Sequence, residues 1–244
     1  MCSLFVLLGV DPEFPIFVAA NRDEDRARLA SPPGLFVGER RRMLSPRDRR
    51  AGGTWMAVND RMWFAGLTNV AGVARRPEAG SRGVLPHLVL DADDLDAGVA
   101  EVERAVAAGG QDAFRLLATD GRRALLVSRT GGALRVDAVA GPVFALSNEH
   151  ALGELTVPGL DRIARDPLPA AARLDALAPL LLERGTAGRH AVLKTGGAYG
   201  TVSSSLLALP RADPGALLWR YAPGPPDVTA YRNYGNLGRR LRAE

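Results

Sequence analysis

The second residue of the chain is its single cysteine, and this position suits nucleophilic chemistry. Met1 precedes a small residue, which is the context in which the initiator methionine is usually removed. Removal leaves Cys2 with both a thiol and a free α-amino group, and the amine titrates near neutral pH and can act as a base. A nucleophile that carries its own base can attack carbonyl compounds. The alternative is a small buried residue at the start of a strand.

A second group of polar residues closes a β-rich run, as Asn21-Arg22-Asp23-Glu24 after Ala19-Ala20. An arginine beside a thiol lowers the pKa of that thiol and increases the thiolate fraction. A carboxylate near an α-amino group orients the amine and favours its charged form. Arg22 and Asp23 are therefore candidates for these two roles, and a solvated strand end with a local ion pair is the alternative.

Glycines and asparagines mark further candidate positions. Gly52-Gly53 precedes Thr54-Trp55, and two glycines before a strand indicate a tight turn or a close backbone approach. Asn69 ends an apolar strand, where its amide can donate a hydrogen bond to a developing oxyanion. Asn148 has a similar setting, and both asparagines also fit a purely structural role as strand caps.

The sequence offers no pattern for a metal centre. A single cysteine excludes an intrachain disulfide framework and a cysteine-rich metal site. His87, His150 and His190 lie far apart in the sequence and lack metal-ligand spacing. We therefore expect no bound metal, and we expect the histidines to be structural or at the surface.

The elements that must position these residues are mainly short strands. Apolar runs predict strands at 5–10, 15–20, 55–58 and 62–67, and the segment Ser31-Pro32-Pro33-Gly34 predicts a loop. Further strands are predicted at 114–119, 124–128, 135–140, 143–146, 202–209 and 216–221.

Two helices are predicted among these strands. Leu95, Val99, Val102 and Val106 fall on one helical face, after an aspartate-rich start and before Gly109-Gly110. A second helix is predicted over 170–184, which Pro179 can kink or split. The order of strands, helix, strands, helix and strands predicts a single α+β domain over residues 1–244, with stacked sheets and outer helices.

Composition limits the class of protein. In this chain of 244 residues, 47% hydrophobic and 24% charged residues are typical of globular proteins and exclude disorder over most of the length. No apolar run approaches the roughly 20 residues that span a bilayer, and the short run Leu4–Val10 lacks the flanks of a signal peptide. We expect a cytoplasmic protein without stable membrane insertion.

Two arginine-rich stretches, at 39–42 and 47–50, raise the hypothesis of nucleic-acid binding. Interleaved acidic residues, few aromatic residues and a net charge of only +4 argue against it. We expect a solvated loop here and no nucleic-acid partner. Its arginines also suit acidic small ligands such as carboxylates.

Taken together, motifs from Met1 to Thr201 resemble those of the NRDE family, also called the transport and Golgi organisation family. In family order, the matching pieces are Met1-Cys2, Ala19–Glu24, Arg47-Asp48, Gly52–Trp55, Leu67–Asn69, Ser81–Gly83, Leu146–Asn148 and Tyr199–Thr201. Each motif is weak by itself, whereas the ordered set is specific.

This resemblance implies a four-layer αββα sandwich of the N-terminal nucleophile (Ntn) hydrolase type. The fold is similar to that of choloylglycine hydrolases and penicillin V acylases, which cleave amides with an N-terminal cysteine. By position, Cys2 matches the nucleophile, Arg22 the arginine beside it and Asp23 the acid near the α-amino group. Asn69 resembles the oxyanion-hole asparagine, and Asn148 resembles the second active-site asparagine.

Three positions complicate this correspondence. Asp25 offers an alternative arginine-to-acid spacing. Val202 stands where family members usually have an arginine after Gly-Thr, and its place in the motif suggests that a substrate-binding cation is lost. Pro158-Gly159 stands where Pro-Trp is usual.

The resemblance implies hydrolysis of a C–N amide or thioester bond in a small or lipid-like acyl substrate, with no required cofactor. NRDE relatives are also associated with haem trafficking and lipid homeostasis. The alternative is therefore a non-enzymatic protein that binds and carries haem or an acyl lipid. Haem would need an apolar slot and an axial ligand, for which Cys2, His87, His150 and His190 are the candidates.

Overall fold

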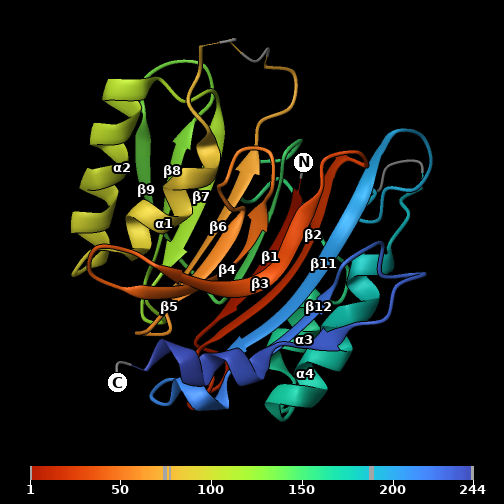
Figure 1. Ribbon diagram of the computed structural model, residues 1–244. Helices are drawn as coiled ribbons and strands as arrows, with labels where there is room; N and C mark the ends of the chain where they lie inside the picture. Colours follow the sequence, from red (N-terminus) through yellow and green to blue (C-terminus); the bar gives the residue numbers. More distant parts are fainter. Residues whose placement is uncertain (1, 74–75, 77, 187–189, 243–244) are drawn as a thin grey trace.

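Two antiparallel sheets stack face to face, and helices cover both outer faces (Figure 1). The computed structural model describes residues 2–73, 76, 78–186 and 190–242, and for Cys2 it describes the backbone alone. The six-stranded sheet has the order β10 (Val143–Ser147), β1 (Cys2–Leu8), β2 (Ile16–Asp25), β11 (Tyr199–Leu209), β12 (Leu218–Ala222) and β13 (Arg232–Asn233). The seven-stranded sheet has the order β3 (Ala30–Val37), β4 (Arg42–Asp48), β5 (Met56–Asn59), β6 (Phe64–Asn69), β7 (Phe114–Thr119), β8 (Ala124–Arg129) and β9 (Arg135–Val139).

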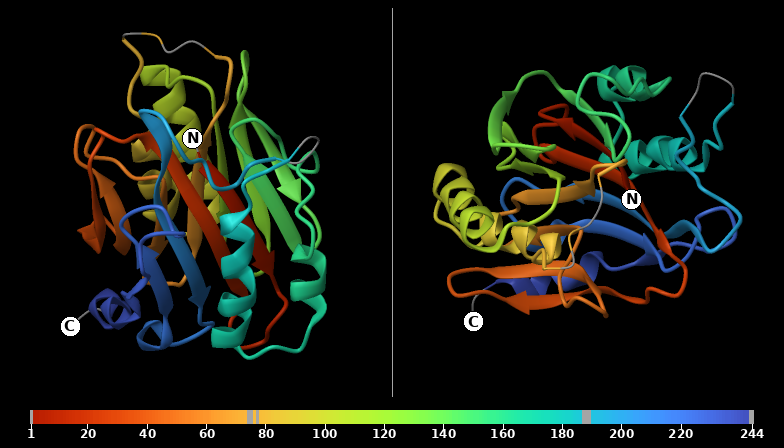
Figure 2. Two further views of the ribbon diagram at one scale, coloured as in Figure 1. Left: turned by 90° about the vertical axis from the view of Figure 1, so that its right-hand side faces the viewer. Right: turned by 90° about the horizontal axis from the view of Figure 1, so that it is seen from above.

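The helices form two outer layers on opposite sides, which Figure 2 shows from the side and from above. Helices α1 (Leu85–Leu90) and α2 (Leu95–Gly109) pack on the seven-stranded sheet, whereas α3 (Leu160–Arg165) and α4 (Ala170–Leu177) pack on the six-stranded sheet. Short 3₁₀ helices span Arg82–Val84, Ala178–Leu182, Pro214–Ala216 and Gly235–Leu241. Within the described residues, no helix combines the length and apolar character required to cross a membrane.

Strand β1 shows why the sandwich has four layers. Its side chains alternate between the two faces of the sheet. Leu4 and Val6 belong to the core between the sheets, while Phe5 and Leu7 belong to the core under α3 and α4. Because both faces are covered, the run is continuously apolar.

The caps of α2 agree with the sequence prediction. The side chain of Asp94 accepts a hydrogen bond from the backbone N–H of Ala97 at 2.8 Å, and Gly110 ends the helix in the left-handed conformation at a φ of 56°. The predicted second helix is α4, which ends at Leu177 and continues as a 3₁₀ turn containing Pro179. The short helices α1 and α3 were missed, because six residues are too few for a clear periodic pattern.

The prediction of a loop at 31–34 is wrong. The prediction of a solvated loop through the arginine-rich stretches holds for the turns at 39–41 and 49–50, and it is wrong for residues 42 and 47–48, which belong to a strand. Residues 30–37 form β3 and residues 42–48 form β4, and the two strands pair as a hairpin. Strand β3 lies at the sheet edge, where prolines need no ladder partner, and the pairing register shifts between Ser31 and Gly34. The prolines therefore mark an edge strand.

Candidate functional site

The strand register brings several candidate residues to one end of the sandwich. The backbone of Cys2 pairs with that of Arg22, and Ser3 pairs with Ser147, so Asn148 directly follows the strand beside β1. Asn69 is the last residue of β6 in the facing sheet. Positions far apart in the sequence thus meet because the two sheets are stacked.

A pocket opens at this end of the molecule. Among the predicted residues, Arg22, Asp23 and Asn69 line it. Asn148 is buried but does not belong to its lining. The predicted nucleophile is the thiol of Cys2, and this side chain lies outside the described part of the chain.

The three residues of the Asn-Arg-Asp segment have separate environments. Asn21 is fully buried, and its Nδ2 atom donates to the backbone oxygens of Leu181 and Val192 at 2.9 and 3.0 Å. These bonds tie β2 to the helix layer, so Asn21 has a structural role. Arg22 and Asp23 remain for the pocket.

Arg22 is held rigidly although it carries a charge in a buried position. Its side chain is only 4% exposed. Its Nη2 atom donates to Oδ2 of Asp48 at 2.9 Å, and its guanidinium carbon lies 4.5 Å from the centre of the Trp55 ring. The planar group is therefore fixed from its end and from its face.

Asp48 is a site residue to which sequence reasoning assigned no role. Its Oδ2 atom also accepts from Arg28 at 2.7 Å, while Oδ1 accepts from the backbone N–H groups of Arg50 and Ala51 at 3.0 and 2.8 Å. Burial raises the pKa of this carboxyl, but the bond from Ala51 and the nearby Arg28 and Arg22 outweigh burial and hold the pKa below its usual value. The signal was present in Arg47-Asp48 just before the paired glycines.

Asp23 has the opposite electrostatic situation. It is buried, and burial raises the pKa of its carboxyl to about 6, although the hydrogen bond from Thr201 lowers it. Thr201 Oγ1 donates to Asp23 Oδ1 at 2.7 Å. The carboxyl therefore changes its protonation state close to neutral pH.

Replacing Asp23 by asparagine should remove a specific pH dependence of stability. Because the folded protein binds this proton more tightly than the unfolded chain, wild-type stability falls as pH rises from about 4 to about 6. We take the difference between the free energies of unfolding of wild type and of Asp23→Asn. This difference should decrease by roughly 2–3 kcal/mol over this pH window and then level off. Denaturant titrations at several pH values measure this difference, and a constant difference would contradict the raised pKa.

A close backbone contact explains the paired glycines. The backbone N–H of Thr54 donates to the oxygen of Gly83 at 2.8 Å. A Cβ atom on Gly53 would lie 2.6 Å from the carbonyl carbon of Gly83, closer than real Cβ contacts allow. Two of the family motifs, Gly52–Trp55 and Ser81–Gly83, therefore meet in the pocket wall.

The Gly53→Ala substitution should separate these two segments. We expect a loss of about 1–3 kcal/mol in the free energy of unfolding, because backbone atoms must move to relieve the overlap. Gly34→Ala is the matched control, since a Cβ there meets nothing within 4 Å. Thermal unfolding of both variants measures the effect, and equal midpoints would show that the contact is not tight.

Asn148 occupies a junction near the pocket. Its backbone oxygen accepts from the backbone N–H of Ala71 at 2.9 Å and from Arg115 Nη1 at 3.4 Å. This backbone contact joins the turn after β10 to the segment after β6, which begins directly beyond Asn69. Asn148 thus positions the two chain segments that carry the asparagines.

The positions that depart from the family pattern also have clear locations. Val202 is the extra residue in a β-bulge of β11, where the register shifts between Thr201 and Ser203 opposite Arg22 and Asp23. Gly159 is the N-cap residue just before α3 and has a φ of 88°, a conformation that favours glycine. Asp25 ends β2 in an exposed position and is not part of the pocket lining.

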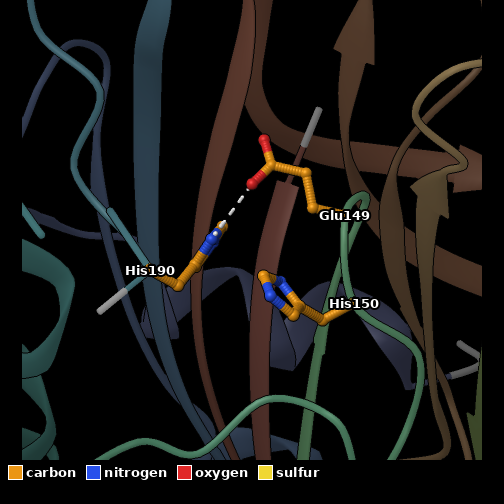
Figure 3. Close-up of side chains that lie close together, drawn as sticks. All are labelled: Glu149, His150 and His190. Carbon is orange, nitrogen blue, oxygen red and sulfur yellow. Dashed lines mark ion pairs between the residues drawn. The ribbon is translucent and has the colours of Figure 1, made fainter. Parts of the chain in front are cut away.

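Two of the three histidines come together in space. The ring centres of His150 and His190 lie 4.8 Å apart in an edge-to-face arrangement, and Glu149 lies beside them (Figure 3). The third, His87, is buried on α1 and stacks on Phe36 at 4.0 Å. Sequence spacing missed the pair because the two residues are 40 positions apart in the chain. His150 follows β10 and His190 precedes β11, and strands β1 and β2 lie between these two strands in the sheet.

Comparisons with known proteins agree with this architecture. The family model described as Transport and Golgi organisation 2 matches residues 1–165. No curated protein sequence matches the chain significantly.

Among solved structures, a mutant conjugated bile acid hydrolase from Clostridium perfringens, C2A, shares 11% identity over 96% of this chain and 92% of its own, with a TM-score of 0.52. The N-acylethanolamine-hydrolyzing acid amidase (NAAA) ortholog of Caenorhabditis elegans shares 11% identity over 85% of this chain and 92% of its own, with a TM-score of 0.56. The predicted αββα fold of the Ntn-hydrolase type is confirmed.

Proposed function

This chain belongs to the Transport and Golgi organisation 2 family, and on that premise we propose that it is an N-terminal cysteine hydrolase that cleaves a C–N amide or thioester bond. The observation that carries the proposal is the register of β1 and β2. It pairs the backbone of Cys2 with that of Arg22, which lines a pocket together with Asn69. The solved structures with this fold are described as a bile acid hydrolase and an acid amidase.

The proposed mechanism uses Cys2 as nucleophile and base. After removal of Met1, the α-amino group takes the thiol proton, and the thiolate sulfur forms a bond to the carbonyl carbon. The side-chain amide of Asn69 stabilises the oxyanion. The amine or thiol leaving group departs with the proton from the α-ammonium group. Water then hydrolyses the acyl-cysteine thioester, which releases a carboxylic acid and restores the thiol.

Arg22 and Asp23 have supporting roles in this proposal. Arg22 is buried and fixed by Asp48 and Trp55, so its positive charge near the start of β1 favours the thiolate. Asp23 orients the α-amino group. Burial raises the pKa of Asp23 and the N-terminal charge lowers it, so hydrolysis should rise with pH as this carboxyl ionises.

The pocket favours a small acyl substrate that carries polar groups. Its lining contains the cations of Arg22, Arg28 and Arg82 as well as several carboxylates. Trp55 and Leu67 are its large apolar side chains. A long lipid tail would leave these charged groups poorly solvated, which costs free energy. We therefore propose a short acyl group with hydrogen-bonding substituents.

Intact mass spectrometry tests the premise of this mechanism. The purified protein should be lighter than the full sequence by one methionine residue. Incubation with acyl 4-nitroanilides and N-acetylcysteamine thioesters should then give a covalent acyl adduct on Cys2 and release of the acid. Retention of Met1 would block the α-amino group and overturn the mechanism.

The carrier alternative has one observation in its favour. A second pocket lies between the segment before α3 and the 3₁₀ turn after α4, and its lining is mainly apolar, with His190 among its residues. An apolar ligand such as haem would suit this lining better than the charged pocket. A haem titration tests this alternative, since binding through a histidine would shift the Soret band. An unchanged Soret band would argue against a haem carrier.

A further inference from the structure

Glu149, His150 and His190 form a cluster outside the proposed hydrolase pocket (Figure 3). Glu149 and His150 belong to the turn after β10, and His190 belongs to the segment that leads towards β11. His190 is 6% exposed at its side chain, while Glu149 is 41% exposed. The cluster is thus anchored on one side and open to solvent on the other.

The donor atoms of the three side chains already converge. One donor atom from each residue lies within 4.8 Å of the others, and Nδ1 of His190 lies 3.2 Å from Oε2 of Glu149. Ligands of a tetrahedral zinc ion are about 3.3 Å apart, given metal–ligand distances near 2.0–2.2 Å. The closest pair fits this spacing directly. Rotation of the exposed Glu149 side chain can shorten the longer separations.

Each of the three side chains also has a partner on its other polar atom. Lys194 Nζ donates to Oε1 of Glu149 at 2.8 Å, which leaves Oε2 for an ion. Ser147 Oγ lies 3.1 Å from Nδ1 of His150, and Ser3 Oγ lies 3.5 Å from Nε2 of His190. Such outer contacts orient the ligands of metal sites. The atom of His190 that faces Oε2 of Glu149 is thus Nδ1, and the ring nitrogen of His150 without this serine contact is Nε2.

We propose that Glu149, His150 and His190 bind a divalent transition-metal ion of the zinc class, with water completing the coordination. Two imidazoles and one carboxylate are a ligand set that suits such ions. Binding displaces the proton that His190 shares with Glu149 and replaces this hydrogen bond by two metal–ligand bonds. The positive charge of Lys194 reduces the affinity but does not occupy Oε2.

The site would connect two segments around the start of β1. One is the turn that begins after Asn148, and the other precedes β11. Ser3, which contacts His190, is the neighbour of Cys2 in the chain. A bound ion would therefore hold the backbone next to the proposed nucleophile. The metal proposal itself does not depend on hydrolysis.

Zinc titration of the full-length Cys2→Ala protein tests the site without interference from the N-terminal thiol. Competition with a chromogenic chelator should show saturation at one Zn²⁺ per chain, and Co²⁺ should give the visible absorption of a low-coordinate site. Glu149→Gln and His150→Gln remove direct ligands, so each should weaken binding by at least the roughly 10- to 100-fold that the loss of an outer contact costs. His87→Gln is the control and should bind as the parent does, because His87 lies on α1.

Two results would overturn the proposal. One is the lack of stoichiometric Zn²⁺ binding by the folded Cys2→Ala protein. The other is undiminished binding in both Glu149→Gln and His150→Gln, which would place the ion elsewhere. Circular dichroism of each variant identifies loss of fold. Because Glu149 is exposed, Glu149→Gln should retain the parent spectrum and keep the test informative.

Discussion

Replacing Cys2 by alanine should reduce the turnover of an amide or thioester substrate by on the order of 10⁴- to 10⁶-fold, because the covalent step loses its nucleophile. The fold should persist, since Cys2 lies at the first position of β1 and the rest of the strand remains paired from Ser3 to Leu8. Steady-state kinetics on a substrate identified by acyl-adduct formation measure the loss, and circular dichroism measures the fold.

Asn69→Ala provides a graded comparison within the same site. Loss of one oxyanion donor should reduce kcat by about 10²–10³-fold, while acyl-adduct formation remains detectable at long times. If Cys2→Ala keeps full activity, the nucleophile is another group. If Asn69→Ala keeps full kcat, the oxyanion is stabilised elsewhere in the pocket.

Replacing Asp48 by asparagine should cause the largest loss of stability among the site residues. The carboxylate accepts from Arg22, Arg28 and two backbone N–H groups, and Arg22 is only 4% exposed. Removing the negative charge leaves the Arg22 guanidinium buried with Glu24 at 3.8 Å as its remaining ion-pair partner. Breaking such a pair costs about 3–5 kcal/mol. Urea titration at pH 7 measures this change.

The same substitution should also change the response to acid. Because the pKa of Asp48 is lower in the folded protein than in the unfolded chain, its contribution is complete above about pH 4. This contribution is lost as pH falls further and the carboxylate takes up a proton. The stability difference between wild type and Asp48→Asn should therefore shrink in acid. This window lies below that of Asp23, so the two effects are separable.

Asp137→Asn is a matched control for Asp48→Asn. Asp137 forms an ion pair with Arg135 at 3.7 Å, and both side chains are at least half exposed. Because solvent screens such a pair, it contributes little to stability. The free energy of unfolding should therefore change by less than about 0.5 kcal/mol. A similar loss in both variants would show that the buried network around Asp48 has no special contribution.

Local pattern was sufficient for the buried strands and for the longest helix. The apolar runs predicted β1, β2, β5 and β6, because both sheets are covered on each face and their strands remain apolar along their length. The single helical face from Leu95 to Val106 predicted α2. Edge strand β3 escaped prediction because its prolines indicate a turn in any local interpretation.

The ordered motifs identified the family and most of the pocket, as Arg22, Asp23 and Asn69 line it. They left open what each polar residue does, since this depends on burial and on partners distant in the sequence. Asn21, Arg22 and Asp23 are consecutive, yet their partners differ. Asn21 donates to the helix layer, Arg22 pairs with Asp48, and Asp23 accepts a hydrogen bond from Thr201.

The sequence by itself determined most of the strands, the helix α2, the αββα fold through its motifs and the residues to test. Tertiary structure alone decided which distant groups meet: Asp48 under Arg22, Gly53 against Gly83, and His190 beside His150. The physical reason is that strand pattern and turn chemistry act over a few residues. Sheet stacking, by contrast, joins strand ends that no local spacing relates, and it alone sets the burial that shifts the pKa of Asp23.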